Sequence, residues 1–282
     1  MKFKRACGLV AIGMLSLVAT TVCLAGSTWT VGRKVASSQQ VSMDRIDHSA
    51  WHTLLQKYVD VRGNVNYTGW KQSLADVRGL DGYLDTLSHA STSLPSSKAG
   101  RLAFWINAYN AVTVKGILRE YPTTSIRNHT AKVFGYNIWT DLTLIVGGHP
   151  VSLEDIEHKL LRKMGEPRIH FAIVCASHSC PRLLNQAYTA QQLEQQLVAN
   201  TRNFFANREN FQYRNGTFYL SAILDWFAAD FGSSDAAILR FISPYLPDKT
   251  AQQAAARGSG SISHLDYDWS LNDQKSVRTA GR

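Results

Sequence analysis

The sequence predicts an α+β fold, and three features point to it. Apolar residues recur at helical spacing in several segments, glycine-containing turns separate short apolar runs, and 45% of the 282 residues are hydrophobic. This composition is typical of a globular chain that is long enough to bury a core. We therefore predict a single domain with about seven helices around a small mixed sheet that contains two hairpins.

The predicted helices follow from the spacing of their apolar residues. The strongest signal covers residues 100–120, and Pro122 ends this helix because proline cannot continue its hydrogen-bond ladder. Ser152 and Asp155 form a variant of the capping box, so another helix is expected to begin at Ser152. The other expected helices cover residues 51–58, 74–87, 189–206, 221–231 and 235–241.

Three segments carry strand signals. Residues 142–151 surround Gly147-Gly148 and residues 211–220 surround Asn215-Gly216, and both dipeptides favour tight hairpin turns. Residues 169–175 form a nearly continuous apolar run, which predicts a buried central strand.

The N-terminus has the pattern of an export signal. Lys2, Lys4 and Arg5 precede an uncharged, mostly apolar run that reaches Ala25. The run is also long enough for an uncleaved signal anchor. Both alternatives place the folded part outside the cytoplasm, in the periplasm or secreted. The predicted order is a signal peptide or anchor (1–25), a flexible tether (26–45), a folded domain (46–272) and a frayed tail (273–282).

Charge and motifs restrict the possible partners. The formal net charge is +9, but the basic residues are dispersed and form no stripe, so no nucleic-acid partner is predicted. Contact with a membrane is expected only through an uncleaved N-terminal segment. No cofactor is predicted. A small molecule, a peptide and an envelope component all remain open as ligands.

Two amides stand out on the predicted helix over residues 100–120. Asn107 and Asn110 share one side of it, beside Trp105 and Tyr109. Buried amides must find hydrogen-bond partners, so these two can clamp the backbone of a loop. The alternative is that they contact a substrate together with the two aromatic residues and polarise its carbonyl group.

Glu157 falls inside the apolar arc of the helix that begins at Ser152. A carboxylate in such a position is costly unless it is paired. One interpretation is an ion pair with an arginine such as Arg168 or Arg182. The other is an acid–base group with a shifted pKa. His158 lies on the flank of the same helix and is expected at the surface.

The segment after the predicted central strand concentrates reactive side chains. Cys175 and Cys180 are the two cysteines outside the leader, with His178 between them and His170 upstream. An oxidising compartment permits a disulfide between the two cysteines. A reactive thiol assisted by histidine is the second interpretation. A metal site from these four residues is the third, but their spacing matches no familiar zinc motif, so no metal is predicted.

Several of these segments occur together and in order in a known family. They are residues 104–110 (FWINAYN), 121–122 (YP), 125–126 (SI), 153–158 (LEDIEH), 161–162 (LR), 168–171 (RIHF), 175–177 (CAS), 179–181 (SCP), 230–231 (DF) and 267–272 (YDWSLN). Over residues 58–272 the chain resembles the domain-of-unknown-function 547 family. The resemblance supports the fold boundaries and the choice of candidate residues, but it implies no reaction.

The residue types favour a thiol-dependent hydrolase or acyl transferase that acts on an amide in the cell envelope. Cys175 would be the nucleophile, His170 or His178 the base, and Glu157 would orient or tune them. The alternative is a non-enzymatic envelope binding module in which Cys175 and Cys180 form a structural disulfide.

Overall fold

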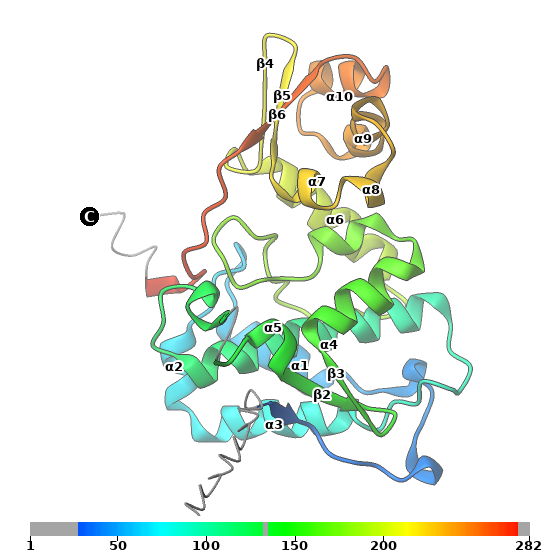
Figure 1. The fold of residues 1–282 in the computed structure, drawn as a ribbon, viewed down its shortest axis with the longest axis vertical. Coiled ribbons are helices and arrows are strands. Elements are labelled where there is room, and N and C mark those ends of the chain that lie inside the picture. The colour runs from blue at the N-terminus through cyan, green and yellow to red at the C-terminus, as the bar shows by residue number, and fades with distance from the viewer. Residues whose placement is uncertain (1–27, 132–134, 276–282) are drawn as a thin grey trace, which may run out of the picture.

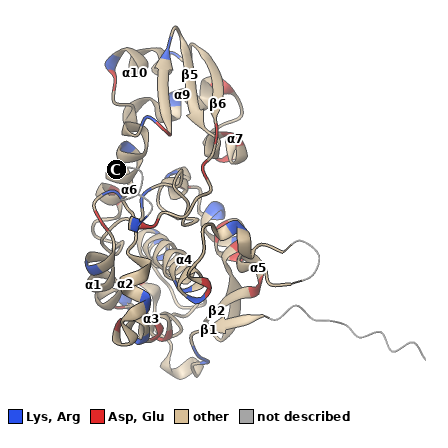
Figure 2. Cartoon of the chain, turned by 90° about the vertical axis from the view of Figure 1, so that its left-hand side faces the viewer, with Lys and Arg blue, Asp and Glu red and all other residues tan. Residues whose placement is uncertain are grey.

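The computed structural model describes residues 28–131 and 135–275 and has the predicted α+β architecture (Figure 1). The predicted leader (1–25) lies outside the described residues, as does residue 276 onward of the predicted tail. Within the described ranges, no helix is both long and apolar enough to cross a membrane. Lys, Arg, Asp and Glu are interleaved over the elements, as expected from the dispersed charge (Figure 2).

Helices make up most of the regular structure. The α-helices are α1 (Ser49–Tyr58), α2 (Tyr67–Gln72), α3 (Leu74–Leu87), α4 (Lys98–Glu120), α5 (Ile138–Asp141), α6 (Leu193–Ala206), α7 (Ile223–Trp226), α8 (Ala228–Phe231), α9 (Asp235–Ile242) and α10 (Lys249–Ala256).

Two separate three-stranded sheets replace the single predicted sheet, and each combines a hairpin with a parallel strand. Both predicted hairpins are confirmed, because Gly147-Gly148 and Asn215-Gly216 adopt the positive φ angles of tight turns. The strands are β1 (Trp29–Val31), β2 (Leu142–Val146) and β3 (His149–Ser152) in one sheet, and β4 (Phe211–Arg214), β5 (Thr217–Ser221) and β6 (Ser261–Leu265) in the other.

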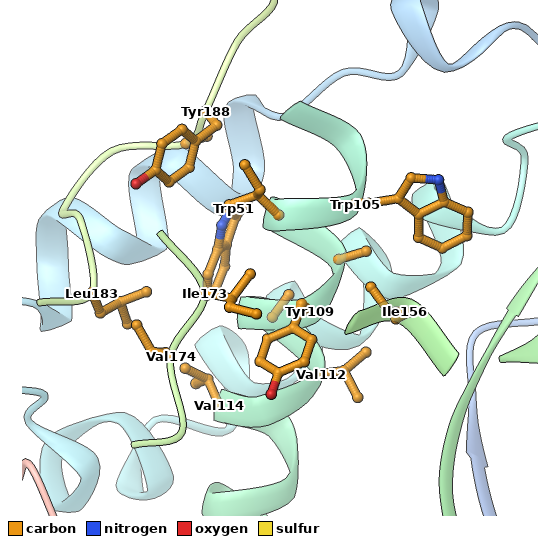
Figure 3. Close-up of a cluster of buried hydrophobic side chains, with 14 of the residues drawn as sticks. Trp51, Trp105, Tyr109, Val112, Val114, Ile156, Ile173, Val174, Leu183 and Tyr188 are labelled. Atoms are coloured by element: carbon orange, nitrogen blue, oxygen red, sulfur yellow. The ribbon is translucent and has the colours of Figure 1, made fainter. Parts of the chain in front are cut away.

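The first hydrophobic core is built around α4, which is buried along most of its length. Helices α2 and α3 and strand β2 contact it, and α1 packs against α3. Figure 3 shows Tyr109, Val112 and Val114 of α4 in one cluster with Ile173 and Val174 of a distant segment. This packing fixes the segment that leads to Cys175 against the middle of α4.

The second core lies between the sheet β4–β5–β6 and the helices α7 to α10. Helix α6 contributes to both cores, with Leu193 and Leu197 in the first and Phe204 and Phe205 in the second. The chain then returns from β6 to the first core, as the red segment in Figure 1 shows. There, Leu271 N–H donates to Thr124 O at 2.8 Å. The C-terminal segment therefore connects the two cores.

The apolar run 169–175 is buried but is not a strand, so this prediction is wrong. A short 3₁₀ helix, Pro167–Phe171, is followed by irregular backbone. Side-chain amides satisfy this backbone in place of a strand ladder. Asn110 donates to Ala172 O at 2.9 Å and accepts from Val174 N–H at 3.0 Å, while Asn200 donates to Phe171 O at 2.9 Å. Buried backbone groups need partners, and these asparagines supply them.

The predicted flexible tether (26–45) is contradicted over its described part. Strand β1 pairs in parallel with β2, and Val31, Val35 and Met43 are buried. Because this segment is rich in Ser and Thr, its sequence did not indicate these few apolar contacts. The start of the predicted frayed tail is likewise packed, because Asp273 is buried and Gln274 N–H donates to Val65 O at 3.1 Å.

Candidate functional site

A cavity of about 350 Å³ opens where the two cores meet the returning C-terminal segment. Tyr109 lines it from the first core and Phe227 from the second, and Tyr267 lines it from the C-terminal segment. Cys175 and Cys180 form part of its wall, and His170 and Glu157 line it as well. We call it the aromatic cavity. Its lining residues are Tyr109, Asn137, Trp139, Glu154, Glu157, His158, His170, Ile173, Val174, Cys175, Cys180, Pro181, Ile223, Trp226, Phe227, Tyr267 and Trp269.

The two cysteines are free thiols in direct contact. Their sulfur atoms are 2.7 Å apart, longer than a disulfide bond of about 2.05 Å. The backbone N–H of Cys175 donates to the sulfur of Cys180 at 2.8 Å. The sulfur of Cys175 also lies 2.8 Å from Ser177 Oγ and 3.2 Å from the Tyr267 hydroxyl. The pair therefore shares a small network of hydrogen-bond donors.

This network favours negative charge on Cys180. Burial raises the pKa of Cys180, but hydrogen bonds from the Cys175 thiol and backbone N–H outweigh it and lower the pKa to about 7. Burial and the neighbouring Cys180 sulfur raise the pKa of Cys175 well above its ordinary value. Within the pair, a thiolate is therefore favoured on Cys180, which accepts a hydrogen bond from the backbone N–H of Cys175.

The backbone between the thiols is strained and is held by the C-terminal segment. Ala176 adopts φ +56°, a left-handed conformation that costs free energy for a residue with a side chain. His178 N–H donates to Ser270 O at 2.8 Å, and Ser179 N–H donates to Asp268 O at 3.1 Å. The positions of the thiols therefore depend on residues almost a hundred positions further along the chain.

His170 is buried and oriented by a carboxylate. Its Nε2 lies 2.7 Å from Asp230 Oδ2, and its ring stacks on Phe227 at a centroid distance of 4.1 Å. Burial lowers the pKa of His170 to about 4 despite Asp230, so the imidazole is neutral at pH 7. Since an ionised Asp230 can only accept, Nε2 carries the proton and Nδ1 is left as an acceptor.

Asp230 is itself held by an arginine. Arg162 Nε and Nη2 donate to its two carboxylate oxygens at 2.6 and 3.0 Å. Burial raises the pKa of Asp230, but the bonds from Arg162 and His170 outweigh it and lower the pKa overall. Asp230 therefore stays ionised and fixes the tautomer of His170.

Glu157 lies on a π-helix, Asp155–Leu161, which follows the predicted cap. Ser152 Oγ accepts from Asp155 N–H at 3.1 Å, and the Asp155 carboxylate accepts from Ser152 N–H at 3.1 Å, so the capping box is confirmed. Tyr109 OH donates to Glu157 Oε2 at 3.0 Å. Burial raises the pKa of Glu157, and this outweighs the lowering effects of His158, of the Tyr109 hydrogen bond and of Arg162.

The interpretation of Glu157 as the ion-pair partner of Arg168 or Arg182 is wrong, whereas the alternative expectation of a hydrogen-bonding partner is confirmed by Tyr109. Arg168 pairs with Glu166 and Glu194. Arg182 donates to the Asn200 side chain. The hydrogen-bond partner of Glu157 is a neutral hydroxyl, and the charges of His158 and Arg162 do not outweigh the burial of the carboxylate, which explains the direction of its pKa shift.

Three aromatic side chains form the rim of the cavity. Trp226 is 47% exposed, which is unusual for tryptophan. It stacks on Trp269 at 5.6 Å and lies 4.8 Å from Tyr267, measured between ring centroids. Arg127 lies over Trp269. Such a rim presents flat apolar surface to a ligand, with the Arg127 guanidinium over one of the rings.

Asn107, Asn110 and Trp105 do not line the aromatic cavity, although they were candidate substrate contacts. Asn107 donates to Tyr188 O at 2.8 Å and accepts from Tyr188 N–H at 2.9 Å. Asn110 clamps the 172–174 backbone, and Trp105 is 2% exposed in the first core. The alternative interpretation, that the amides clamp loops, is confirmed. Tyr109 is the one candidate substrate contact that reaches the cavity.

His178 lies apart from the other candidates. It is exposed and lines a second, more polar cavity, which also contains Cys180 and Pro181. His170, by contrast, shares the aromatic cavity with Cys175, because the segment between them is not the regular strand that would have placed them on opposite faces. Among the described residues, no cluster of three or more His, Cys, Asp and Glu is arranged to hold a metal ion.

The sequence assigned no role to Arg162, Asp230 or Tyr267. Asp230 and Tyr267 lie in segments that carry the family resemblance, and this was the signal available for them. Their contacts with His170 and Cys175 span 60 and 92 residues of sequence, so local spacing could not reveal them.

The comparison with known families matches the part of the chain that carries most of these groups. Residues 94–205 match the model of a family described as "Protein of unknown function, DUF547". No curated protein and no solved structure matches the chain. The matched segment includes Glu157, His170 and both cysteines, whereas Asp230 and Tyr267 lie outside it. The resemblance to this family that the sequence indicated is thus supported over residues 94–205.

Proposed function

We propose that the protein is a thiol-dependent acyl transferase or hydrolase that binds an amide-type substrate in the aromatic cavity. The observation that carries this proposal is the contact between the thiols of Cys175 and Cys180 on the wall of a cavity that also holds an oriented imidazole. A thiolate nucleophile, a base and a group that orients the base are the parts that such chemistry needs.

The hydrogen bonds favour Cys180 rather than Cys175 as the attacking sulfur. Cys180 accepts from the Cys175 backbone N–H at 2.8 Å and carries the lower pKa, about 7. A thiol that titrates near ambient pH is both ionised and nucleophilic. Cys175 then acts as a positioning residue, because its thiol and backbone N–H stabilise the thiolate.

The reaction would proceed through a thioester. The Cys180 thiolate attacks the carbonyl carbon, a C–S bond forms, and the C–N bond breaks as the amine leaves with a proton. A raised pKa favours the protonated form of Glu157, which makes it the candidate donor of that proton. Water, with His170 Nδ1 as its base, then hydrolyses the thioester to a carboxylic acid and the free thiol.

The contact between the sulfurs also supports the alternative function. Removal of two protons and two electrons by an oxidant would join Cys175 and Cys180, and the cavity would remain as a ligand site without a nucleophile. The protein would then be a non-enzymatic binding module in which the disulfide stabilises the strained 175–180 loop.

A simple acyl donor separates the two functions. The reduced full chain is incubated with p-nitrophenyl acetate, and released p-nitrophenolate and intact mass are followed together. The proposal predicts a burst of one equivalent and an acetyl adduct that hydroxylamine removes. Cys180→Ser should abolish the adduct, and Ser259→Ala, a change of an exposed serine between α10 and β6, should not. Absence of any thioester from the reduced, folded protein would rule out the enzyme.

We further propose that this activity lies outside the cytoplasm, in the cell envelope or secreted. The basic start and the uncharged run to Ala25 support this. Alkaline phosphatase fused to the C-terminus of the full chain should be active, because that enzyme needs an oxidising compartment. A stable but inactive fusion would contradict export.

A further inference from the structure

The second cavity, which His178 lines and which we call the polar cavity, carries basic side chains that the proposed reaction does not use. It measures about 660 Å³ and shares Cys180 and Pro181 with the aromatic cavity. Among its lining residues, Arg62 and Arg182 are basic and Glu209 is the one carboxylate. The remaining polar lining consists mainly of asparagine side chains, which offer hydrogen-bond donors as well as acceptors.

Arg182 is a half-buried guanidinium with no carboxylate partner among the described residues. Its Nε donates to Asn200 Oδ1 at 2.7 Å, and its Nη1 donates to Val61 O at 3.3 Å. Both partners are neutral. Burial lowers the pKa of Arg182, which is the direction expected for a cation that gives up water without gaining an anion.

The fold holds Arg182 in place. Asn200 on α6 also donates to Arg182 O at 3.2 Å, so one buried amide forms hydrogen bonds with both the side chain and the backbone of Arg182. On the other side, the turn at Gly63 passes so close that a side chain there would overlap Arg182 Cβ, at 2.5 Å. The guanidinium is therefore positioned before any ligand arrives, which lowers the entropic cost of binding.

Arg182 also lies close to the reactive pair. It follows Cys180 by two residues, so their α-carbons are at most roughly 7 Å apart. A ligand that passes Cys180 from the aromatic cavity into the polar cavity would reach a fixed cation. Guanidinium groups bind planar carboxylates through two parallel hydrogen bonds.

We infer that Arg182 binds a carboxylate of the substrate on the side of Cys180 away from the aromatic rim. This inference rests on the proposed function and narrows it. The substrate class becomes an amide that joins an apolar or aromatic acyl group to a carboxylate-bearing amine, such as an N-acylated amino acid or a peptide end. The aromatic cavity takes the acyl group, and the polar cavity takes the amine product.

Benzoylglycine tests the inference, with its neutral carboxamide, benzoylglycinamide, as the matched probe. Binding of each to the reduced full chain is measured by titration calorimetry at fixed ionic strength. Benzoylglycine should bind at least about tenfold more tightly, the factor expected for a charge-assisted pair. Arg182→Met should abolish this preference, and Arg182→Lys should keep part of it. Arg202→Met, which removes an exposed arginine of α6, should leave it unchanged.

Equal affinity of the two probes for the wild-type chain would overturn the inference, as would failure of both to bind. A preference that survives in folded Arg182→Met would also overturn it. If Arg182→Met does not fold, the wild-type preference must weaken with added NaCl and be reduced in Arg182→Lys. Affinity and acylation are separate readouts, so absence of a carboxylate preference leaves the p-nitrophenyl acetate result intact, and an inert thiol would leave the carboxylate preference intact.

Discussion

At the scale of single residues, Glu157 shows how burial changes the pH dependence expected for a carboxylate. An ion pair would make Glu157→Gln destabilising at neutral pH. With a tyrosine hydroxyl as its partner, burial instead raises the pKa of Glu157 above its ordinary value near 4.5. A raised carboxyl pKa contributes stability that is complete below pH 4.5 and is lost as the pH rises through the folded pKa.

We therefore predict that Glu157→Gln gains stability relative to wild type as the pH rises from 4 to 8. Each unit of difference between the folded and unfolded pKa corresponds to about 1.4 kcal/mol. The exposed Glu154→Gln serves as the control and should show no such trend. Urea unfolding at several pH values measures both. A Glu157→Gln variant that loses stability with rising pH would indicate a cationic partner after all.

For the cysteine pair, the sequence could predict that the two sulfurs come together, but it could not predict which of them is ionised. The spacing of Cys175 and Cys180 made contact between them conceivable, and the structure brings the sulfurs together. Which sulfur carries the charge depends on a backbone N–H and on Tyr267, whose positions spacing does not reveal.

At the scale of elements, the structure confirms the predictions that rest on local sequence patterns. The helix α4 follows from its periodicity and from Pro122, and both hairpins follow from two turn dipeptides. Strands β1 and β6 carry no comparable signal, because neither belongs to a hairpin and each pairs in parallel with a strand that is distant in sequence. The apolar run 169–175 indicated burial correctly, but periodicity cannot tell a strand ladder from backbone held by side-chain amides.

We predict that these amide clamps are essential to the segment that carries the site. Asn110→Ala and Asn200→Ala should each lower the free energy of unfolding by about 1–3 kcal/mol, because buried backbone groups of residues 171–174 lose their partners. Asn203→Ala, an exposed change on the same helix as Asn200, should cost little. Chemical denaturation compares the three. Costs as small for Asn110→Ala and Asn200→Ala as for Asn203→Ala would mean that the segment does not depend on the clamps.

At the scale of the whole molecule, the site exists only where distant segments meet. His170 belongs to the segment before the thiols, Asp230 to the second core and Tyr267 to the returning chain. One sequence cannot predict such a meeting, because nothing in the spacing of residues links positions 60 to 92 apart. The interleaved helical and strand signals were nevertheless enough to predict the α+β class.

A further prediction for the whole molecule concerns how its free energy of unfolding changes at low pH. His48, the residue before α1, lies with its Nδ1 2.7 Å from the Tyr83 hydroxyl. Burial lowers the pKa of both His48 and His170 to about 4, from an ordinary value of 6.5. The unfolded chain therefore takes up protons first, and stability falls as the pH drops from 6.5 toward 4, by at most about 3 kcal/mol per imidazole. His48→Gln should reduce this loss, and His178→Gln, an exposed change, should not. Unfolding that is insensitive to pH across this range would show that both imidazoles protonate freely in the folded state.

The central claim is that Cys180, supported by Cys175, is a reactive thiolate in the folded protein. The most direct test is the rate of alkylation by iodoacetamide between pH 5 and 9, followed by intact mass and peptide mapping on the reduced full chain. We predict one rapid alkylation, at Cys180, with its midpoint near pH 7. Cys175→Ser should move this midpoint upward, because the thiolate loses the thiol that donates to it. Two thiols that stay unreactive until the protein is denatured would contradict the claim.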